Sequence, residues 1–203
     1  NQQLLRADFE SIPGEDALQG ALQIYRDALA QARVVLVSDY GKGGTRNISS
    51  MIGLAREQDI PVYIDPKGND YSAYRGATLI TPNLSEFQQV VGDVHELDEI
   101  DSAAQALMHE LELSACLVTL SERGMLLCRH GQVPVHQPAR AREVYDVTGA
   151  GDTVIAMMAL ARAAGMDDEQ AMQLANHAAG VVVSKLGTAS ASLDEIVVSM
   201  GRV

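Results

Sequence analysis

Short apolar runs alternate with segments of helical periodicity through the middle of the chain, and this alternation constrains the fold more than any other feature. Runs rich in Val, Leu and Ile occupy residues 34–37, 61–64, 78–80 and 116–120. Between them, residues 47–58 and 97–111 carry apolar positions three and four apart, and a further helix is expected to begin at Asn83. Such a pattern predicts a parallel sheet whose faces are both covered by helices, through right-handed crossovers.

The last part of the chain predicts a hairpin followed by helices. Apolar runs at residues 125–128 and 133–136 flank a turn that contains Gly131, which is the pattern of two antiparallel strands. Three helices are expected next, over residues 151–164, 168–186 and 192–200. Gly165 and Gly187 stand where a left-handed residue ends a helix, and Leu186 is expected in the core.

Composition and charge narrow the class of protein. A chain of 203 residues with 47% hydrophobic residues fits one domain, and no repeat or linker divides it. The net charge of −12 argues against nucleic acid or an anionic membrane as a partner. No apolar run reaches the roughly 20 residues that a membrane-spanning helix needs. Cys116 and Cys128 lack a metal-binding spacing, which favours reduced thiols in a cytoplasmic protein.

The strongest signal of chemistry is the segment Asp146-Val147-Thr148-Gly149-Ala150-Gly151-Asp152-Thr153. Its two glycines allow a sharp turn directly before an apolar helix and leave space for a ligand. The free N–H groups of a first helical turn, together with the helix dipole, favour an anion there. Asp152 is placed to accept a proton from a hydroxyl that attacks a phosphoryl group, although an acidic residue suits any helix start.

Two other phosphate-binding motifs fail at single positions. A dinucleotide-binding GxGxxG that begins at Gly149 requires glycine at position 154, where the chain has Val154. A P-loop requires Ser or Thr after its lysine, and Lys42 is followed by Gly43. The turn before Asp152 therefore needs another explanation.

Residues 147–153 resemble the signature of the ribokinase-like (PfkB-type) carbohydrate kinases. The resemblance implies a three-layer α/β/α fold with a mostly parallel sheet. It also implies Asp152 as the catalytic base, and an anion hole formed by Gly149, Ala150 and Gly151. Val154 departs from the Phe that is usual in this family; it is expected to pack in the core and to leave the chemistry unchanged.

The segment Asn83-Leu84-Ser85-Glu86 follows the third strand and begins a helix. Asn at the N-cap and Glu three residues later form a capping box, which explains both residues without any ligand. The segment also resembles a motif of the same family, which implies that these four residues bind ATP. Asn83 and Glu86 would then organise Mg²⁺, mainly through water, as suits a hard cation that retains its water.

The fourth strand and a late helix supply the other nucleotide contacts. Residues 119–124 resemble the nucleotide loop of the family, with Ser121 in place of a glycine, and Thr119 and Gly124 are expected to contact ATP. An ordinary turn between strands is the alternative. The resemblance also places the adenine at Asn176, among small residues of a helix. The adjacent His177 is expected to be partly exposed and not a ligand.

Two strand ends carry candidate contacts to the sugar. Asp39 and Lys42 follow the first strand, and Lys67 follows the second, so all three can reach the same edge of the sheet. Lysines beside glycines suit an anionic substrate, although two solvated turn lysines are the alternative. We therefore expect Asp39, Lys42 and Lys67 to bind the sugar.

The motifs S-D-Y-x-K-G, I-D-P-K-G, T-P-N-L-S-E and E-V-Y-D-V-T-G-A-G-D together resemble the heptose 7-phosphate kinase domains of the bacterial bifunctional enzymes that make ADP-heptose. This resemblance implies ATP-dependent phosphorylation of the anomeric hydroxyl of D-glycero-β-D-manno-heptose 7-phosphate. ATP and Mg²⁺ are the implied cofactors, and whether a monovalent cation is also required stays open. A homodimer with a fused nucleotidyltransferase is the implied assembly, and lipopolysaccharide core synthesis the implied pathway.

By this resemblance, the sequence lacks the N-terminal third of such a kinase domain. It also begins without Met or a signal-peptide pattern. We therefore expect residues 1–203 to be the C-terminal two-thirds of one kinase domain within a longer protein. Two alternatives stay open. One is a kinase of the same family for another sugar or sugar phosphate, and the other is a nucleotide-binding fragment that is inactive in isolation.

Overall fold

The computed structural model describes residues 13–41, 43, 45–140 and 144–201. One six-stranded sheet runs in the order β1-β2-β3-β4-β5-β6. Its strands are β1 (Val35–Ser38), β2 (Val62–Asp65), β3 (Leu79–Ile80), β4 (Ala115–Thr119), β5 (Met125–Arg129) and β6 (Val135–Gln137). Strands β1 to β4 are parallel, and β5 and β6 form the antiparallel hairpin. The predicted mostly parallel sheet and hairpin are confirmed.

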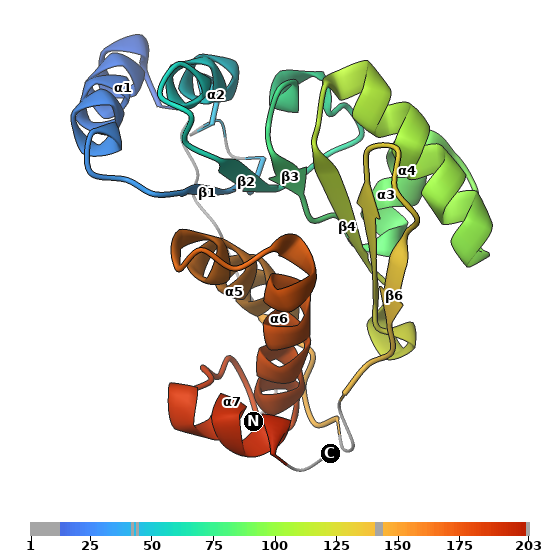
Figure 1. Ribbon diagram of the computed structural model, residues 1–203. Coiled ribbons are helices and arrows are strands. Elements are labelled where there is room, and N and C mark those ends of the chain that lie inside the picture. Colours follow the sequence, from blue (N-terminus) through green and yellow to red (C-terminus); the bar gives the residue numbers. More distant parts are fainter. Residues whose placement is uncertain (1–12, 42, 44, 141–143, 202–203) are drawn as a thin grey trace, which may run out of the picture.

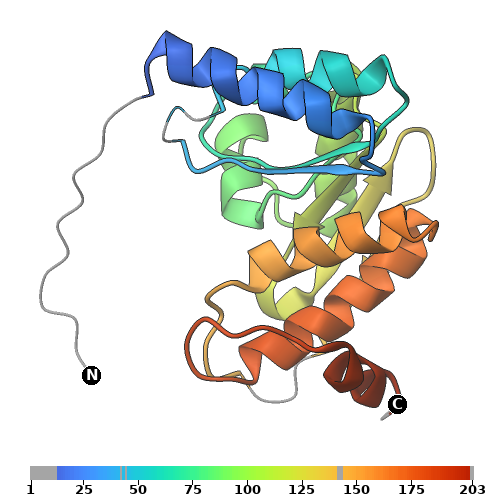
Figure 2. The ribbon, with the colours of Figure 1, turned by 90° about the vertical axis from the view of Figure 1, so that its left-hand side faces the viewer.

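Helices cover both faces of this sheet (Figures 1 and 2). The first layer contains α1 (Glu15–Leu29), α2 (Ile48–Arg56), α3 (Leu84–Val91) and α4 (Leu97–Leu111). The opposite layer contains α5 (Ala150–Ala163) and α6 (Asp168–Val183), and α7 (Leu193–Met200) packs against α6. Two single turns, η1 (Ser72–Tyr74) and η2 (Ser121–Arg123), complete the described elements. The result is the expected three-layer α/β/α arrangement.

Alternation along the strands divides the interior into two cores. On β2, Val62 and Ile64 face the layer of α2 and α4, whereas Tyr63 between them faces α5 and α6. Successive strand residues point to opposite faces, so a strand covered on both sides must be apolar throughout. Val154 is 3% exposed and belongs to the second core, as predicted. Both cysteines are free thiols buried in the first core.

Several elements differ from the sequence-based prediction, and three of the differences are informative. Helix α1 was not predicted, although Leu18, Leu22, Tyr25 and Leu29 recur at spacings of four, three and four residues. Strand β6 begins two residues later than expected. Helix α6 ends at Val183 and not at residue 186, so Leu186 lies outside the helix and is 83% exposed. The prediction that Leu186 belongs to the core is therefore wrong.

The carboxyl ends of β1 to β4 lie along one edge of the sheet because these strands are parallel. The residues that follow them include Asp39, Lys67, Asn83 and Ser121, so this edge gathers most of the predicted site. Edges of this kind are where open α/β sheets bind ligands. Within the described residues, no helix has the length and apolar content to cross a bilayer.

Candidate functional site

Helix α5 begins at a glycine whose backbone is left-handed. Gly149 is the N-cap, with φ of 80° and ψ of 3°, a conformation that costs most other residues about 1–2 kcal/mol. The Thr153 hydroxyl donates to the Gly149 carbonyl at 2.8 Å, and the Asp146 carboxylate accepts the Thr148 N–H at 2.9 Å. These bonds hold the turn on both sides of Gly149. Asp152 is exposed in the first turn of the helix that follows.

The N–H groups of this turn are not equally available. The Ala150 N–H donates to the Val147 carbonyl at 3.2 Å, so part of its hydrogen-bonding capacity is used within the turn. Ala150 and Gly151 both face the large cavity described below. Among the predicted anion-hole residues, Gly149 therefore shapes the turn while Ala150 and Gly151 face the cavity.

Asp65, the last residue of β2, is influenced by two other carboxylates and one ammonium group. The pKa of Asp65 is raised from 3.8 to about 6, chiefly by burial and then by the negative charges of Glu86 and Asp152. The positive charge of Lys67 acts in the opposite direction. The charges of Glu86, Lys67 and Asp152 therefore all act on Asp65, and Lys67 and Glu86 form an ion pair. Sequence reasoning missed Asp65 as a site residue, although it stands at the end of a strand within I-D-P-K-G.

Glu86 joins two structural roles. Its backbone N–H donates to Asn83 Oδ1 at 2.9 Å, and its Oε2 accepts the Asn83 N–H at 3.1 Å, so the predicted capping box is present. Its other oxygen, Oε1, lies 2.7 Å from Lys67 Nζ. Lys67 was predicted to bind the sugar, but in the structure its ammonium group lies beside Glu86.

A divalent cation fits this cluster only with help from water or phosphate. In the described part of the chain, no three His, Cys, Asp or Glu side chains are close enough to hold a metal ion together. Mg²⁺ usually keeps several waters and binds proteins through one or two carboxylates together with substrate phosphates. The exposed Asn83 side chain and the mostly buried Glu86 carboxylate suit that indirect mode.

A cavity of about 880 Å³ lies next to this cluster, between α3, the end of β4 and the N-terminal turn of α5. Eight of the predicted nucleotide and anion contacts line it: Asn83, Leu84, Ser85, Thr119, Gly124, Ala150, Gly151 and Asn176. Its far wall is a stripe of small residues on α6, Ala179 and Gly180. The volume suits a cofactor-sized ligand.

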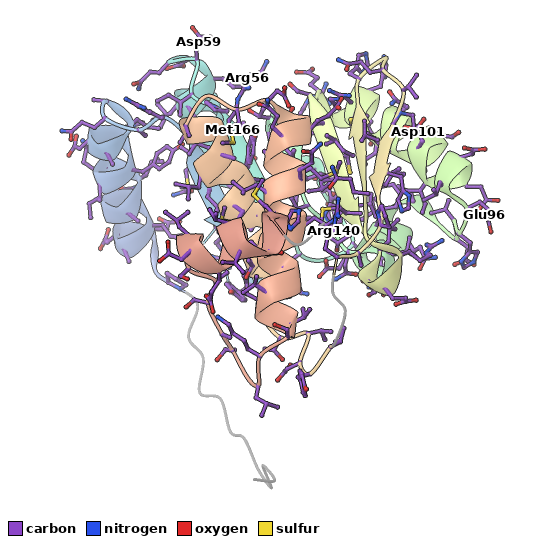
Figure 3. The ribbon with its side chains drawn as sticks, turned by 60° about the horizontal axis from the view of Figure 1, so that its bottom comes forward. Arg56, Asp59, Glu96, Asp101, Arg140 and Met166 are labelled. Carbon is purple, nitrogen blue, oxygen red and sulfur yellow. The ribbon has the colours of Figure 1, made fainter. Side chains whose placement is uncertain are left out.

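Two of these cavity residues, Asn176 and Gly124, also position the segment that follows β6. The buried Asn176 donates from Nδ2 to the Pro138 carbonyl at 2.9 Å. A Cβ on Gly124 would lie 1.9 Å from the Gln137 carbonyl oxygen, so only glycine lets the segment after β6 pass there. That segment brings Arg140 to the cavity beside α6 (Figure 3). Arg140 was not predicted, because it belongs to no motif and only the packing brings it there.

The backbone conformation of Ser121 and the burial of His177 are both set by the surrounding structure. Ser121 has φ of 53°, in the left-handed region, which explains physically why glycine suits this position. His177 was expected to be partly exposed, and this is wrong: it is 7% exposed, with Nδ1 2.8 Å from the Ser199 hydroxyl of α7. The docking of α7 over α6 buries it, and burial lowers its pKa. The prediction of a non-ligand role remains.

The loop after β1 is organised by Asp39. Its Oδ1 accepts the Gly41 N–H at 2.8 Å, and its Oδ2 accepts the Tyr74 hydroxyl at 2.8 Å. Lys42 lies outside the described residues. Asp39 thus lies at the predicted edge of the sheet, and it is held there by residues that sequence reasoning did not select.

We expect Asp65→Asn to stabilise the fold at pH 8. The pKa of Asp65 is raised to about 6 in the folded state, so stability is lost as the pH rises from about 4 to 6. The amide is neutral and escapes this loss. After discounting for partial exposure, the gain is about 1–2 kcal/mol at pH 8 and falls toward zero near pH 4. Urea unfolding without Mg²⁺ at several pH values measures it, with the exposed Asp93→Asn as the control. A variant that is no more stable than wild type at pH 8 contradicts the placement.

The chain resembles known proteins along almost its whole length. Residues 12–196 match the family model described as pfkB family carbohydrate kinase. The chain is 55% identical over 196 residues to the bifunctional protein HldE of Pseudomonas paraeruginosa, and 54% identical to that of Pseudomonas aeruginosa strain PAO1. In both comparisons 97% of this chain is covered but only 41% of the relative. The chain thus spans about two-fifths of the length of these relatives.

Solved structures support the same fold at low sequence identity. The ribokinase of Arabidopsis thaliana, solved with ribose and ATP, superposes with a TM-score of 0.78 at 24% identity, covering 95% of this chain and 61% of that one. Phosphofructokinase-2 from Escherichia coli, solved with potassium, gives 0.78 at 20% identity, covering 94% and 63%. The three layers are therefore those of the ribokinase-like fold. Together with the match over residues 12–196, this shows that the chain belongs to the pfkB family of carbohydrate kinases.

Proposed function

We propose that this chain transfers the γ-phosphoryl group of ATP to the anomeric hydroxyl of D-glycero-β-D-manno-heptose 7-phosphate, giving the 1,7-bisphosphate. The observation that carries the proposal is the 55% identity over 97% of the chain to proteins named bifunctional protein HldE. The heptose kinase motifs at the carboxyl edge of the sheet support it. Since the chain covers 41% of those relatives, their whole-protein activity is extended to it only as a proposal.

Asp152 is the proposed base. Its exposed carboxylate stands in the first turn of α5, where it accepts the proton of O1 as O1 attacks the phosphorus. The O1–P bond forms while the bond between phosphorus and the β–γ bridging oxygen breaks, and ADP leaves. The turn at Gly149, with the cavity-facing Ala150 and Gly151, holds the charge of the migrating group. Among the substitutions considered, removal of this base is expected to lower kcat the most.

The cavity of about 880 Å³ is the proposed ATP site. The adenine lies against Asn176, Ala179 and Gly180, and the phosphates extend past Thr119 and Gly124 toward the cluster at Asp65. Asn83 and Glu86 would hold Mg²⁺ through water, and Leu84 and Ser85 line the cavity beside Asn83. Bound Mg²⁺ supplies neutralisation of the β- and γ-phosphate charge. A requirement for a monovalent cation is tested by omitting K⁺ from the assay.

The acceptor occupies the edge formed by the loops after β1 and β2. Asp39 and, from the sequence alone, Lys42 are the proposed acceptor contacts. Lys67 lies beside Glu86, so we assign its ammonium to the phosphoryl group as it moves between donor and acceptor. Homodimer formation and a fused nucleotidyltransferase in ADP-heptose synthesis belong to the same proposal.

Glu86→Gln is expected to raise the Mg²⁺ concentration for half-maximal activity by about tenfold, the equivalent of one lost charge-assisted interaction. Gln preserves the capping box, so the helix start is retained. Glu195→Gln is a matched control, because Glu195 is also the third helical residue of a capping box and lies 2.7 Å from Lys185. A normal Mg²⁺ titration with a raised sugar KM would place Glu86 on the acceptor side.

An acceptor screen tests the proposed function. The intact protein is incubated with Mg²⁺–ATP and a panel of sugars and sugar phosphates, and ADP release is measured. The highest kcat/KM is expected for D-glycero-β-D-manno-heptose 7-phosphate. A higher kcat/KM for another sugar phosphate would replace the substrate and keep the kinase assignment. If the protein binds nucleotide but phosphorylates no acceptor, the kinase proposal fails and the protein is a nucleotide-binding module.

A further inference from the structure

Tyr74, the last residue of η1, connects two loops of the proposed site. Its hydroxyl donates to Asp39 Oδ2 at 2.8 Å and accepts the Lys67 N–H at 3.0 Å, and the Lys67 carbonyl oxygen is 3.2 Å away. Asp39 follows β1 and Lys67 follows β2. One phenolic oxygen therefore bridges the two loops that end neighbouring strands.

The two bridged loops have different roles in the proposed reaction. The loop after β1 carries Asp39, whose other oxygen is held by the Gly41 N–H at 2.8 Å. The loop after β2 carries Lys67, whose ammonium lies 2.7 Å from Glu86 Oε1. The second loop is thus attached to the nucleotide side by an ion pair of its own. The first is attached to it through Tyr74.

The ring of Tyr74 is held independently of its hydroxyl. The residue is 2% exposed, and its ring centroid lies 5.5 Å from that of Tyr71. The Ser49 hydroxyl of α2 donates to the Ala73 carbonyl at 2.9 Å, which fixes η1 to the first helical layer. Burial also raises the pKa of Tyr74, so its hydroxyl stays protonated at neutral pH and donates to the carboxylate. Removing the oxygen alone should therefore leave η1 in place.

We propose that Tyr74 is a positioning residue that fixes the acceptor-binding loop, through Asp39, at a set distance from the phosphoryl-transfer loop at Lys67. The inference rests on the proposed function, because that function assigns the β1 loop to the acceptor. The proton donated by Tyr74 orients the Asp39 carboxylate, which leaves its remaining lone pairs for hydroxyl groups of the sugar. Tyr74 itself need not touch either substrate.

Tyr74→Phe in the intact protein tests this role, with Tyr71→Phe as the matched control. Tyr71 is the neighbouring ring, tilted by 56° against Tyr74 and equally buried, and its hydroxyl has no hydrogen-bond partner among the described residues. Tyr74→Phe is expected to raise the KM for the sugar phosphate about tenfold, the loss typical of one hydrogen bond to a charged group. The KM for ATP should stay within about twofold. Tyr71→Phe should change neither constant.

Equal effects of the two variants on the sugar KM would overturn the proposal, as would a rise in the ATP KM that matches the rise for the sugar. A lower Tm for Tyr74→Phe with unchanged KM values would make the hydroxyl structural only, which also overturns it. Failure of the proposed function looks different, because wild type would then not phosphorylate the heptose 7-phosphate. The same comparison is then made with the acceptor that the screen identifies.

Discussion

Asp152→Asn is expected to lower kcat by about 10²–10⁴-fold while the affinity for ATP changes less than about twofold. The amide has nearly the shape of the carboxylate but cannot take the proton of the attacking hydroxyl. Asp152 is exposed in the first turn of α5, so the substitution removes little packing. Steady-state kinetics with the intact protein give kcat, and titration with a non-hydrolysable ATP analogue gives the affinity.

Asp194→Asn is the matched control for this experiment. Asp194 also lies in the first turn of a helix, α7, away from the cavity. The Asp194→Asn variant measures the effect on stability of removing a negative charge at a helix N-terminus, which is about 0.3–1 kcal/mol. A value of kcat near that of wild type in Asp152→Asn would end the assignment of the base. A similar loss in both variants would mean that the effect comes from stability.

Lys67→Met is expected to lower kcat/KM by about 10- to 150-fold, the equivalent of losing a charge-assisted hydrogen bond of about 1.5–3 kcal/mol. Lys67 is the cation that offsets the negative charges of Glu86 and Asp152 around Asp65. Without it, one positive charge fewer offsets the repulsion between the phosphoryl group and these carboxylates. We expect the same loss with heptose 7-phosphate and with unphosphorylated heptose, since the phosphoryl group is common to both reactions.

The comparison of the two acceptors identifies which anion Lys67 serves. A loss confined to heptose 7-phosphate would mean that the ammonium meets the sugar phosphate, as its place in the sequence first suggested. An unchanged kcat/KM with both acceptors would mean that Lys67 only forms a surface ion pair with Glu86. Lys185→Met is the control, because Lys185 forms an ion pair of the same length, 2.7 Å, with Glu195 outside the site.

Local motifs predict the parts of this protein that depend on neighbouring residues in the chain. The capping box of Asn83 and Glu86 and the glycine turn before Asp152 are set by contacts within four residues, and both are present. The end of α6 was less predictable. Val183 and Leu186 are equally apolar in sequence, and only the position of the chain after the helix buries one and exposes the other.

Contacts between distant segments explain the residues that the sequence did not reveal. Lys67 meets Glu86 across 19 residues, and Tyr74 reaches Asp39 across 35. His177 is buried because α7, which begins 16 residues later, packs against α6. No spacing rule relates such pairs. Asp65 is an intermediate case, since its position at a strand end was visible but its charged neighbours were not.

Phosphorylation of the anomeric oxygen can be observed by ³¹P NMR of the reaction mixture. The intact protein, Mg²⁺–ATP and D-glycero-β-D-manno-heptose 7-phosphate are incubated together. We expect one new phosphomonoester resonance coupled to the anomeric proton, formed in equal amount with ADP and absent with Asp152→Asn. ADP formed without this resonance, or a new phosphate on another carbon of the sugar, would disprove transfer to the anomeric oxygen.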